Sequence, residues 1–386
     1  MKYLCIITLL FINTITQAQI VDIPDANFKN ALINDEVADL GNFFYEDVDT
    51  NNDGEIQVSE AEAVIGLNVN YYDISSMEGI EYFINLIILE CEDNLLTSLD
   101  IAQNINLSGL YCGSNSITEL DVTQNINLGF LLCYGNMLTT LDITQNINLI
   151  HINFSLNNVA EIDVSQNINL STLRCRFNNL SEIDVSQNTG LTTLGITGNN
   201  ISEIDLTQNQ EILFFTCGAN NFAELDLSQN HNLYWFQCNL NENLEYLDLR
   251  NGGNIGLSLM FAHETPNLRC ILVDDKAFAD SQECGLPTSG WCIDDNDMYV
   301  EVMEDCILGI EDNTIINFTI YPNPTQNILF IETQQPIEAL KIYNLNGQLI
   351  MEDYSKRVDV SNLIVGLYFV QVLIDGKSET KKFVKE

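Results

Sequence analysis

The sequence repeats itself every 21 residues across residues 67–273, and this period restricts the fold more than any other feature. Aspartate recurs at this step from Asp100 to Asp226 without a slip, and residues 107–127 show the whole unit, L-x-x-L-x-C-x-x-N-x-L-x-x-L-D-V-[ST]-Q-N-x-x. The alternation at the end of Leu-x-x-Leu-x-Cys predicts one short strand per repeat with its apolar side chains inward. One coil cannot bury that face alone. The repeats are therefore expected to stack into a solenoid with a parallel β-sheet on its concave face.

An asparagine and a cysteine also recur in each unit. The asparagine side chain can donate to and accept from backbone groups exposed where the chain turns, which predicts a hydrogen-bonded ladder along the solenoid. The cysteines replace an inward-facing apolar residue, and Phe154 and Ile196 fill the same position in two repeats. We interpret the cysteines as a ladder of buried free thiols, with disulfides and a metal site as the alternatives. They are Cys91, Cys112, Cys133, Cys175, Cys217 and Cys238.

The repeated aspartates would stack roughly 5 Å apart, at the strand spacing of a solenoid, and would repel one another unless something compensates. Each is followed two residues later by Ser or Thr in most repeats, as in Asp121 and Thr123. An Asx-type turn, in which the carboxylate accepts the backbone N–H two residues on, is the expected role. Bound cations along the column are the alternative.

The combined Leu, Asn and Cys positions resemble the leucine-rich repeats of bacterial internalins, in the form that carries a cysteine ladder. The similarity covers about residues 67–273. It implies the leucine-rich-repeat fold and a binding role, and it carries no information about the ligand.

The N-terminus predicts export. Lys2 precedes a short apolar run, and Thr16 and Ala18 supply small residues at the −3 and −1 positions of a cleavage site after Ala18. Residues 1–18 are therefore expected to be a signal peptide. Cys5 starts the apolar run, whereas a lipidated cysteine would follow it, and no later stretch approaches the length of a membrane helix.

The charge is uneven along the chain. Residues 19–318 contain 6 Lys and Arg against 47 Asp and Glu, whereas residues 319–386 contain 7 against 8. Such an acidic body disfavours nucleic acid, whose phosphates require cations, and favours oxygen-ligated cations such as Ca²⁺. The shift in charge marks the clearest domain boundary, near residue 318.

An N-terminal cap is expected over residues 19–66. Residues 24–36 read as an amphipathic helix, with Phe28, Ala31 and Leu32 on its apolar side. The following segment matches the twelve-position EF-hand loop, in which Gly54 takes the sharp turn and Ile56 anchors the loop to the core. The predicted Ca²⁺ ligands are Asp49, Asn51, Asp53, the Glu55 backbone carbonyl, Gln57 through water, and Glu60 with both oxygens. An acidic loop without metal is the alternative.

Residues 274–317 read as a C-terminal cap and linker, after two last strands within residues 257–261 and 268–273. Four cysteines fall outside the ladder in this loop-rich, acidic part, namely Cys270, Cys284, Cys292 and Cys306. We expect disulfides among them because the segment is expected to be exposed and exported proteins meet oxidising conditions. Their pairing stays open.

Residues 318–386 read as a small β-sandwich, with strands expected at 327–332, 340–343, 367–373 and 381–384 and hairpin turns at Asn346-Gly347 and Asp375-Gly376. Its motifs, residues 321–325 (YPNPT), 341–347 (KIYNLNG) and 363–368 (L-x-x-G-x-Y) with a basic end, resemble the type A sorting domain of the type IX secretion system. The resemblance implies a Bacteroidetes protein that the secretion machinery carries across the outer membrane, with this domain then removed at the surface. A plain adhesive sandwich is the alternative.

Three positions per repeat should point out of the concave sheet, one on each side of the second Leu and one after the Cys. Aromatic residues and arginine are enriched at interface centres, and basic residues are rare in the repeats. Arg174 and Arg176, side by side on one strand, therefore mark a candidate binding face. Its other expected members are Tyr111, Phe130, Tyr134, His151, Phe214, Tyr234 and Trp235.

Catalysis is not expected. The three histidines, His151, His231 and His263, have no Ser or Cys partner at a recognisable spacing, and no G-x-S-x-G, H-E-x-x-H or phosphate loop occurs. The sequence thus predicts a secreted or outer-membrane surface-attached binding protein that contacts an extracellular protein through its concave face. A carbohydrate ligand is the second reading, and a hydrolase with an unrecognised carboxylate pair the third.

Overall fold

The computed structural model describes residues 19–41, 44–285, 289–295, 297–301, 318–333, 336–345, 347–374 and 377–386. The chain divides into two compact units, Met1–Ile307 and Leu308–Glu386. The expected signal peptide and Cys306 lie outside the described residues.

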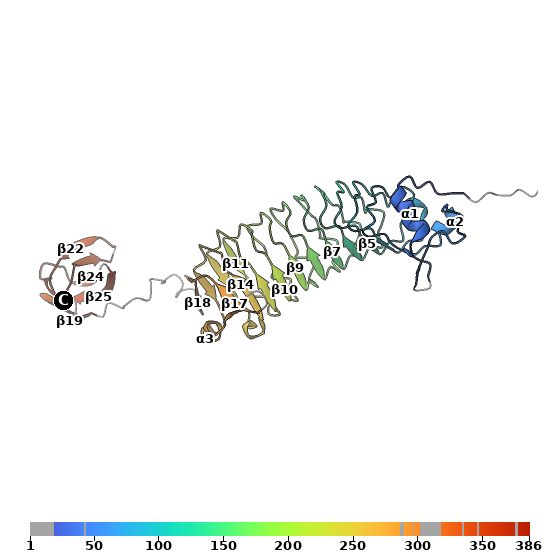
Figure 1. Cartoon of the computed structure of the whole chain (residues 1–386). Helices are drawn as coiled ribbons and strands as arrows, with labels where there is room; N and C mark the ends of the chain where they lie inside the picture. Colours follow the sequence, from blue (N-terminus) through green and yellow to red (C-terminus); the bar gives the residue numbers. More distant parts are fainter. Residues whose placement is uncertain are drawn as a thin grey trace, which may run out of the picture. The chain divides into compact units, whose positions relative to one another are not determined.

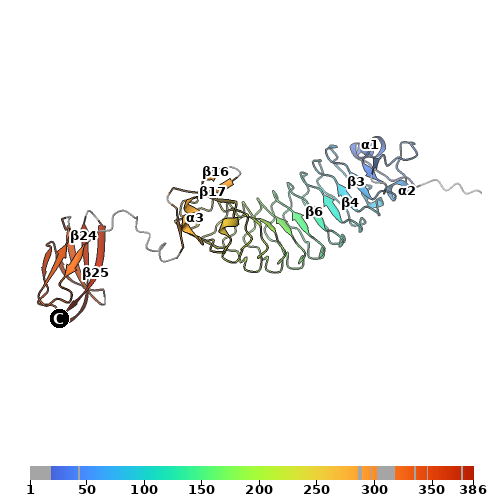
Figure 2. The same ribbon diagram turned by 90° about the horizontal axis from the view of Figure 1, so that it is seen from below.

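The first unit is a solenoid whose short strands stack side by side (Figures 1 and 2). From β3 to β14 each strand pairs in parallel with the strand of the next coil. In sheet order the 14 described strands are β16 (Cys284–Gly285), β17 (Ser289–Ile293), β14 (Leu259–Ala262), β12 (Trp235–Gln237), β10 (Phe214–Thr216), β9 (Thr193–Gly195), β8 (Thr172–Arg174), β7 (His151–Asn153), β6 (Phe130–Leu132), β5 (Gly109–Tyr111), β4 (Ile88–Glu90), β3 (Gly66–Asn68), β1 (Ala38–Asp39) and β2 (Tyr45–Glu46). The predicted leucine-rich-repeat solenoid is confirmed.

The N-terminal end of the sheet is covered by α1 (Ala26–Asn34), which buries Phe28, Ala31 and Leu32 as expected. Asp25 caps this helix through Oδ1, which accepts the Asn27 and Phe28 N–H groups. The other oxygen of Asp25, Oδ2, accepts hydrogen bonds from the backbone and the hydroxyl of Ser75. One carboxylate therefore both starts the helix and fastens it to the first coil.

Two short 3₁₀-helices and a four-residue α-helix complete the irregular parts of the solenoid. The α-helix α2 (Val58–Ala61) follows the predicted calcium loop, η1 (Ile80–Tyr82) lies in the first coil, and η2 (Asn254–Gly256) lies near the end of the regular repeats.

The ladder cysteines are all buried free thiols, as expected for small apolar residues. Burial raises the pKa of the Cys133 and Cys175 thiols to about 12. Because the thiolate is the reactive form, these side chains are chemically inert in the folded protein. The disulfide alternative for this column does not apply, because all six cysteines are free.

The predicted asparagine ladder is present after each strand. Asn136 shows its pattern, because its Nδ2 donates to the carbonyls of Cys112 and Cys133 while its Oδ1 accepts the Ile117 N–H. Each side chain therefore bridges one coil to the preceding coil.

A second asparagine ladder, which we did not expect, lies at the Gln-Asn step of each repeat. Asn146 is fully buried and its Nδ2 donates to the carbonyls of Val122 and Asn125, 2.9 Å away in both cases. Its Oδ1 is buried without a hydrogen-bond partner among the residues that the structure describes. Equivalent bonds recur at Asn104, Asn125, Asn167, Asn188, Asn209 and Asn230.

The aspartate column forms the predicted Asx turns. In Asp121 and Asp142 one carboxylate oxygen accepts the backbone N–H two residues on, at 2.9 Å in both. Hydrogen bonds from the hydroxyl and the backbone N–H of Thr123 hold the pKa of Asp121 below its ordinary value. These bonds stabilise the ionised carboxylates that stack along the column.

The solenoid continues beyond residue 273, where we expected it to end. The strand β17 extends the main sheet in parallel with β14, and a second parallel sheet contains β11 (Glu224–Asp226), β13 (Tyr246–Asp248), β15 (Cys270–Leu272) and β18 (Met298–Val300). The strands β14 and β15 match the two last strands expected within residues 257–261 and 268–273, whereas β17 and β18 were not expected because the repeat spacing becomes irregular beyond residue 273.

The C-terminal cap adds α3 (Lys276–Asp280) and a disulfide between Cys284 and Cys292. Cys270 is also disulfide-bonded. The expectation of disulfides is confirmed for these cysteines, but the exposure that we assumed is wrong for Cys270 and Cys292. Both are buried on strands and fill the core at the end of the solenoid.

Asp297 is a half-buried carboxylate in this cap, in a hollow of about 350 Å³ that Lys276, Trp291 and Tyr299 help to line. Burial, reinforced by the charge of Asp294, raises the pKa of Asp297 to about 7. Its Oδ2 accepts the Asp294 backbone N–H.

The second unit is the predicted all-β sandwich, built around one core that includes Leu329, Ile342, Val370 and Phe383. One sheet contains β19 (Thr319–Tyr321), β20 (Ile328–Glu332) and β23 (Arg357–Asp359), and the other contains β22 (Leu349–Asp353), β21 (Ala339–Asn344), β24 (Gly366–Ile374) and β25 (Lys377–Lys385). The strands β21 and β22 pair in antiparallel fashion, as do β24 and β25. Both hairpins are therefore where expected, although Asn346 and Asp375-Gly376 lie outside the described residues.

Replacing Asn146 by Ala should destabilise the solenoid by about 2–4 kcal/mol, because two buried carbonyls would lose their donor. Urea unfolding followed by circular dichroism measures this loss. The matched control is Asn148→Ala, which removes one exposed bond to the Ile126 carbonyl and should cost less than about 1 kcal/mol. Equal losses for the two variants would contradict a structural role for the second ladder.

Replacing Asp297 by Asn should stabilise the cap at pH 8 but not at pH 4. Because folding raises the pKa of this carboxyl group from 3.8 to about 7, the folded protein loses stability as the pH rises from about 4 to 7 and the buried group ionises. An Asn side chain does not ionise, so the variant avoids this loss. Because Asp297 is only half-buried, we expect a gain of roughly 1–2 kcal/mol at most. Thermal melts at pH 4, 6 and 8 test this, with the exposed neighbour Asp295→Asn as control.

Candidate ligand-binding face and calcium loop

Three columns of side chains point out of the main sheet, at the register positions that the repeat predicts. In β7 and β8 the central residue is buried and its two neighbours are partly exposed, and the third column follows the buried cysteine. The nine predicted face residues lie on or directly beside these columns, but the structure divides them into separate groups.

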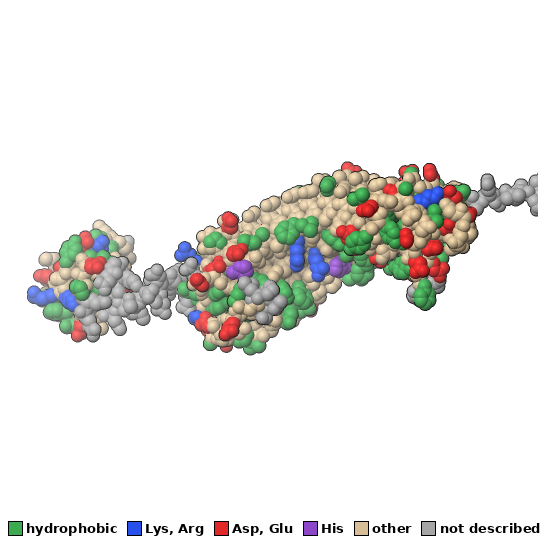
Figure 3. Space-filling view, viewed as in Figure 1, with side chains coloured by type: hydrophobic (Ala, Val, Ile, Leu, Met, Phe, Trp, Pro, Cys, Tyr) green, Lys and Arg blue, Asp and Glu red, His purple; other side chains and the backbone are tan. Residues whose placement is uncertain are grey.

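Arg174 lies on β8, in the middle part of the sheet, and Arg176 follows it two residues later. Basic side chains (blue) lie on the middle part of the solenoid in the space-filling view (Figure 3). In the neighbouring strands Arg174 is flanked by Asn153 and Gly195. The backbone N–H of Arg176 donates to the Ser155 hydroxyl at 3.1 Å, which fixes the backbone beside the second guanidinium. Within the described residues, neither guanidinium forms a salt bridge with a carboxylate.

The electrostatic environment of the two arginines is unusual for so acidic a chain. Between β5 and β12 the three columns contain no Asp or Glu, and the nearest acids on them, Glu90 and Glu92, are four coils from the arginines. Burial and the charge of Arg174 lower the pKa of Arg176. The same two effects, in that order, lower the pKa of His151, which is therefore uncharged at neutral pH.

Aromatic rings lie on both sides of the arginines. On one side the Phe130 and His151 rings stack with centroids 6.4 Å apart, and on the other Phe214 and Tyr234 meet edge to face at 6.0 Å. Phe130, Phe214 and Tyr234 each expose about two fifths of their surface or more. Trp235 differs, because it packs against Leu259 and Phe261 at the C-terminal end and is half-buried.

Tyr111 and Tyr134 belong to a different neighbourhood from the arginines. The ring of Tyr134 lies over Gly113, where an added Cβ would come within 2.6 Å, and its hydroxyl forms a hydrogen bond with Glu92. Burial and the charges of Glu90 and Glu92 raise the pKa of Tyr111. The two tyrosines therefore lie near acidic side chains toward the N-terminal end of the sheet, and the Tyr134 hydroxyl is already hydrogen-bonded within the protein.

A fourth column borders the face, one position before each strand, and it is apolar in several coils. Its apolar members Ile87, Ile150, Leu213 and Tyr234 are all more than a third exposed, whereas small or polar residues fill the position before β5, β6, β8 and β9. A hollow of about 540 Å³ lies beside it, lined by Phe130, Ile150 and nearby polar residues. Of this column only Tyr234 was among the predicted face residues. The apolar residues directly before several of the expected strands could have indicated the others.

The predicted calcium loop contains the expected turn. Gly54 has φ +82° and Asn52 φ +59°, and Ile56 is fully buried. Asp49 is buried, and its two oxygens accept the Asp53 and Gly54 N–H groups. The Asp49 carboxylate therefore stabilises the turn of the loop through these hydrogen bonds.

The remaining predicted ligands are linked by hydrogen bonds. The Asn51 amide donates to Gln57, and the Gln57 amide donates to the carboxylate of Asp53. Glu60 is buried and accepts the Asn51 N–H through Oε1 and the Gln57 N–H through Oε2. The Glu55 carboxylate instead pairs with Lys29 at 2.6 Å, which leaves its backbone carbonyl as the group that faces the loop.

The loop differs from a complete EF-hand in its surroundings. The strands β1 and β2, and not a helix, precede it, and α2 after it has only four residues. Across the described parts of the chain, no three His, Cys, Asp or Glu side chains gather into a metal cluster. The donor set still fits Ca²⁺ in kind, because it combines carboxylate, amide and backbone oxygens around a glycine turn.

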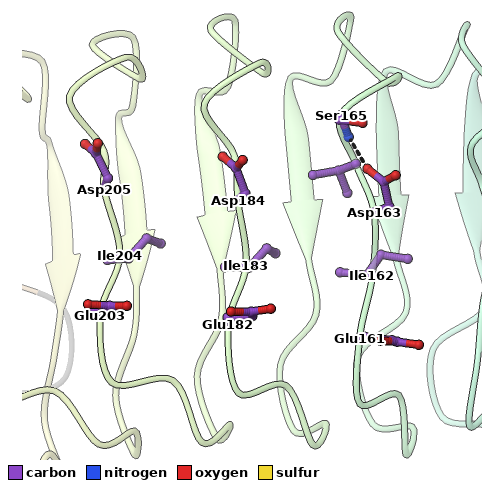
Figure 4. Close-up of a pocket in the computed structure, with 11 residues that line it drawn as sticks. Glu161, Ile162, Asp163, Ser165, Glu182, Ile183, Asp184, Glu203, Ile204 and Asp205 are labelled. Carbon is purple, nitrogen blue, oxygen red and sulfur yellow. Dashed lines mark hydrogen bonds between the residues drawn. The ribbon is translucent and has the colours of Figure 1, made fainter.

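A shallow groove of about 570 Å³ lies on another wall of the solenoid, away from the main sheet (Figure 4). Two rows of carboxylates flank buried and half-buried isoleucines there, with Glu161, Glu182 and Glu203 in one row. The other row is part of the Asx-turn column, in which Asp163 accepts the Ser165 N–H. Hydrogen bonds lower the pKa of these aspartates, whereas a general acid requires a raised pKa.

Solved structures resemble the solenoid, and a protein-family model matches the C-terminal unit. Internalin C2 from Listeria monocytogenes is similar to this chain with a TM-score of 0.50 and 21% identity, over 57% of this chain and 97% of that one. At this identity the similarity shows the fold alone. The functional domain of InlJ from Listeria monocytogenes, described as including a cysteine ladder, has a TM-score of 0.49 and 21% identity over 96% of this chain and 99% of that one. The search of curated proteins found no match.

None of the helices in the described parts of the chain is long and apolar enough to cross a membrane. Residues 319–386 match the family described as the secretion system C-terminal sorting domain. This domain indicates export through the type IX secretion system. The chain therefore combines a leucine-rich-repeat solenoid with a secretion sorting tail, and it is a secreted or cell-surface protein.

Proposed function

We propose that the exported protein is a binding protein that holds an extracellular protein ligand on the concave face of its solenoid. The observation that carries this proposal is the row of exposed aromatic and partly exposed arginine side chains across the middle of the main sheet. Aromatic residues and arginine are the side chains that dominate interface energetics. They stand here on a rigid sheet, so little conformational entropy is lost when a ligand binds.

The sorting domain supports a location of the protein outside the cell. Residues 318–386 would contact the type IX secretion machinery, after which they are removed or the protein is anchored at the outer-membrane surface. The solenoid would then be presented outside the cell, where its ligand is found. We do not propose that the protein is an enzyme. The experiment below also tests the two alternatives, a carbohydrate ligand and hydrolase activity.

Phe130→Ser combined with Phe214→Ser should weaken ligand binding at least about tenfold, because both rings are exposed at the proposed contact. The full chain without its signal peptide is first screened on arrays of extracellular proteins and glycans, beside a panel of hydrolase substrates. The affinity of each hit is then measured for the wild type and the variant.

The matched control is Ile126→Ser combined with Ile168→Ser. These side chains are at least as exposed as the two phenylalanines but lie in the turns four residues before a strand, outside the face. A ligand lost by the control variant and kept by the phenylalanine variant would place binding elsewhere. Turnover of a hydrolase substrate would overturn the proposal that the protein only binds.

We further propose that the loop at residues 49–60 binds Ca²⁺ and that the ion stabilises the N-terminal cap. Asp49, Asn51, Asp53 and Glu60 would supply side-chain oxygens, with the Glu55 carbonyl and Gln57 completing the set. The support is the sharp turn at Gly54 and the linkage of these donors by hydrogen bonds. A structural role is favoured because Lys29 in α1 already pairs with the loop, so ordering of the loop also orders the helix.

Ca²⁺ should raise the melting temperature of the wild type relative to EDTA, because a ligand that binds only the folded state stabilises it. Asp53→Asn should reduce this rise and weaken Ca²⁺ binding about tenfold or more in calorimetry, since it removes one charge from the site but keeps an oxygen that can accept the Glu55 N–H. Glu62→Gln, next to the loop but outside it, serves as control. A wild type whose melting temperature ignores Ca²⁺ would refute the calcium proposal.

A further inference from the structure

Two arginines without acidic partners are unexpected in a chain with a net charge of −41. Five other Lys and Arg side chains in the described residues lie within 4 Å of a carboxylate, namely Lys29, Arg250, Lys276, Lys341 and Lys381. Arg174 and Arg176 instead lie in the part of the face that lacks acids. The positive charge of this pair is therefore available to a group from outside the chain.

The side chain of Arg176 lies over Gly195 of β9, where the sheet has no side chain. A Cβ on Gly195 would lie 2.9 Å from Arg176 Nε and 3.4 Å from the Thr216 hydroxyl, so both polar atoms border the same space. Arg176 Nε and Thr216 Oγ1 are both buried, and neither has a hydrogen-bond partner among the described residues. Ser155, on the other side of Arg176, adds a second hydroxyl.

Leaving such groups without partners is costly. A buried donor or acceptor without a hydrogen bond destabilises the folded protein, and a charged group does so more strongly. The face thus presents two partly exposed guanidinium groups that have no carboxylate partner among the described residues, so a group from outside the chain can bind to them. An oxyanion fits this set, because guanidinium groups bind carboxylates with two parallel hydrogen bonds.

We propose that Arg174 and Arg176 receive a single carboxylate from an extracellular protein segment, an Asp or Glu side chain flanked by apolar residues. This inference rests on the proposed function, since it names the chemistry of the ligand on the same face.

The charge of the chain selects a single carboxylate over a polyanion. A sulfated glycan or a nucleic acid needs several cations along its length, and the acidic body repels a high density of negative charge. The face offers two adjacent cations with no others on the three columns between β5 and β12. One carboxylate matches this local charge.

The surroundings of the arginines favour a protein segment over a sugar. The exposed aliphatic side chains of Ile150 and Leu213 border the face on the two sides of the arginines, and Phe130 lines the hollow beside Ile150. Aliphatic and aromatic side chains of a protein would bury these surfaces, whereas sugar hydroxyls would lose hydrogen bonds with water there. The ligand segment therefore has an apolar residue on each side of its carboxylate.

The test uses a phage library that displays random 12-residue peptides, selected on the full chain without its signal peptide. We expect the selected peptides to contain Asp or Glu between apolar residues. In synthetic copies, replacing that acid by Asn or Gln should weaken binding at least tenfold. Arg174→Gln combined with Arg176→Gln should cause a similar loss. Combining the protein and peptide changes should add little, because both remove the same contact.

The matched control is Arg250→Gln combined with Arg269→Gln, which removes the same charge from residues near the second sheet. The control should keep full affinity. The Arg174 and Arg176 variant should also keep or raise the melting temperature of the wild type, because it removes a charged group that lacks a partner. A lower melting temperature would indicate a structural role for the arginines and overturn the proposal.

The remaining outcomes separate this inference from the proposed function. Selected peptides that lack acidic residues, or that the arginine variant binds as well as the wild type does, would overturn the carboxylate site. If the Phe130 and Phe214 variant no longer binds such peptides, the proposed binding face would still be supported. Binding of heparin or polygalacturonate that depends on the arginines, with no peptide selected, would replace the protein segment by a glycan. Binding that neither variant affects would overturn the proposed function itself.

Discussion

The solenoid depends on asparagine side chains that donate hydrogen bonds from one coil to the backbone of the coil before it. Each 21-residue turn leaves carbonyl groups facing the interior, where water cannot reach them. Asn136 and Asn146 represent the two ladders that satisfy these groups, at the two ends of each coil. The leucine core can close only because this buried backbone is paired.

The regular coils place the outward side chains at fixed intervals, so the chemistry of the face follows from which residues occupy a few columns. Small residues on these columns matter as much as large ones. Gly113 gives Tyr134 a surface to lie on, and Gly195 does the same for Arg176. The result is a face on which one tyrosine is held near acids while the arginine pair is left without a carboxylate partner among the described residues.

Much of this arrangement could be predicted from the spacing of residues. The columns, the buried thiols and the Asx turns follow from a period that repeats without a slip, because each coil has the same environment. The second asparagine ladder was equally regular, but its Asn lies in a polar Gln-Asn step that reads as a surface turn. Burial of that step depends on how the coils pack, which spacing alone does not express.

Local periodicity and short motifs in the sequence are sufficient to predict the solenoid, its inward and outward positions, the glycine turn of the predicted calcium loop and the sandwich of the sorting domain. Contacts between side chains of different coils follow from the tertiary structure. It brings Tyr134 to Glu92 and lays the Arg176 side chain over Gly195, beside Thr216. These contacts depend on the direction and size of neighbours that are 19 or more residues apart, and the pairing of Cys284 with Cys292 depends on how the chain turns at the end of the solenoid. No local pattern carries that information.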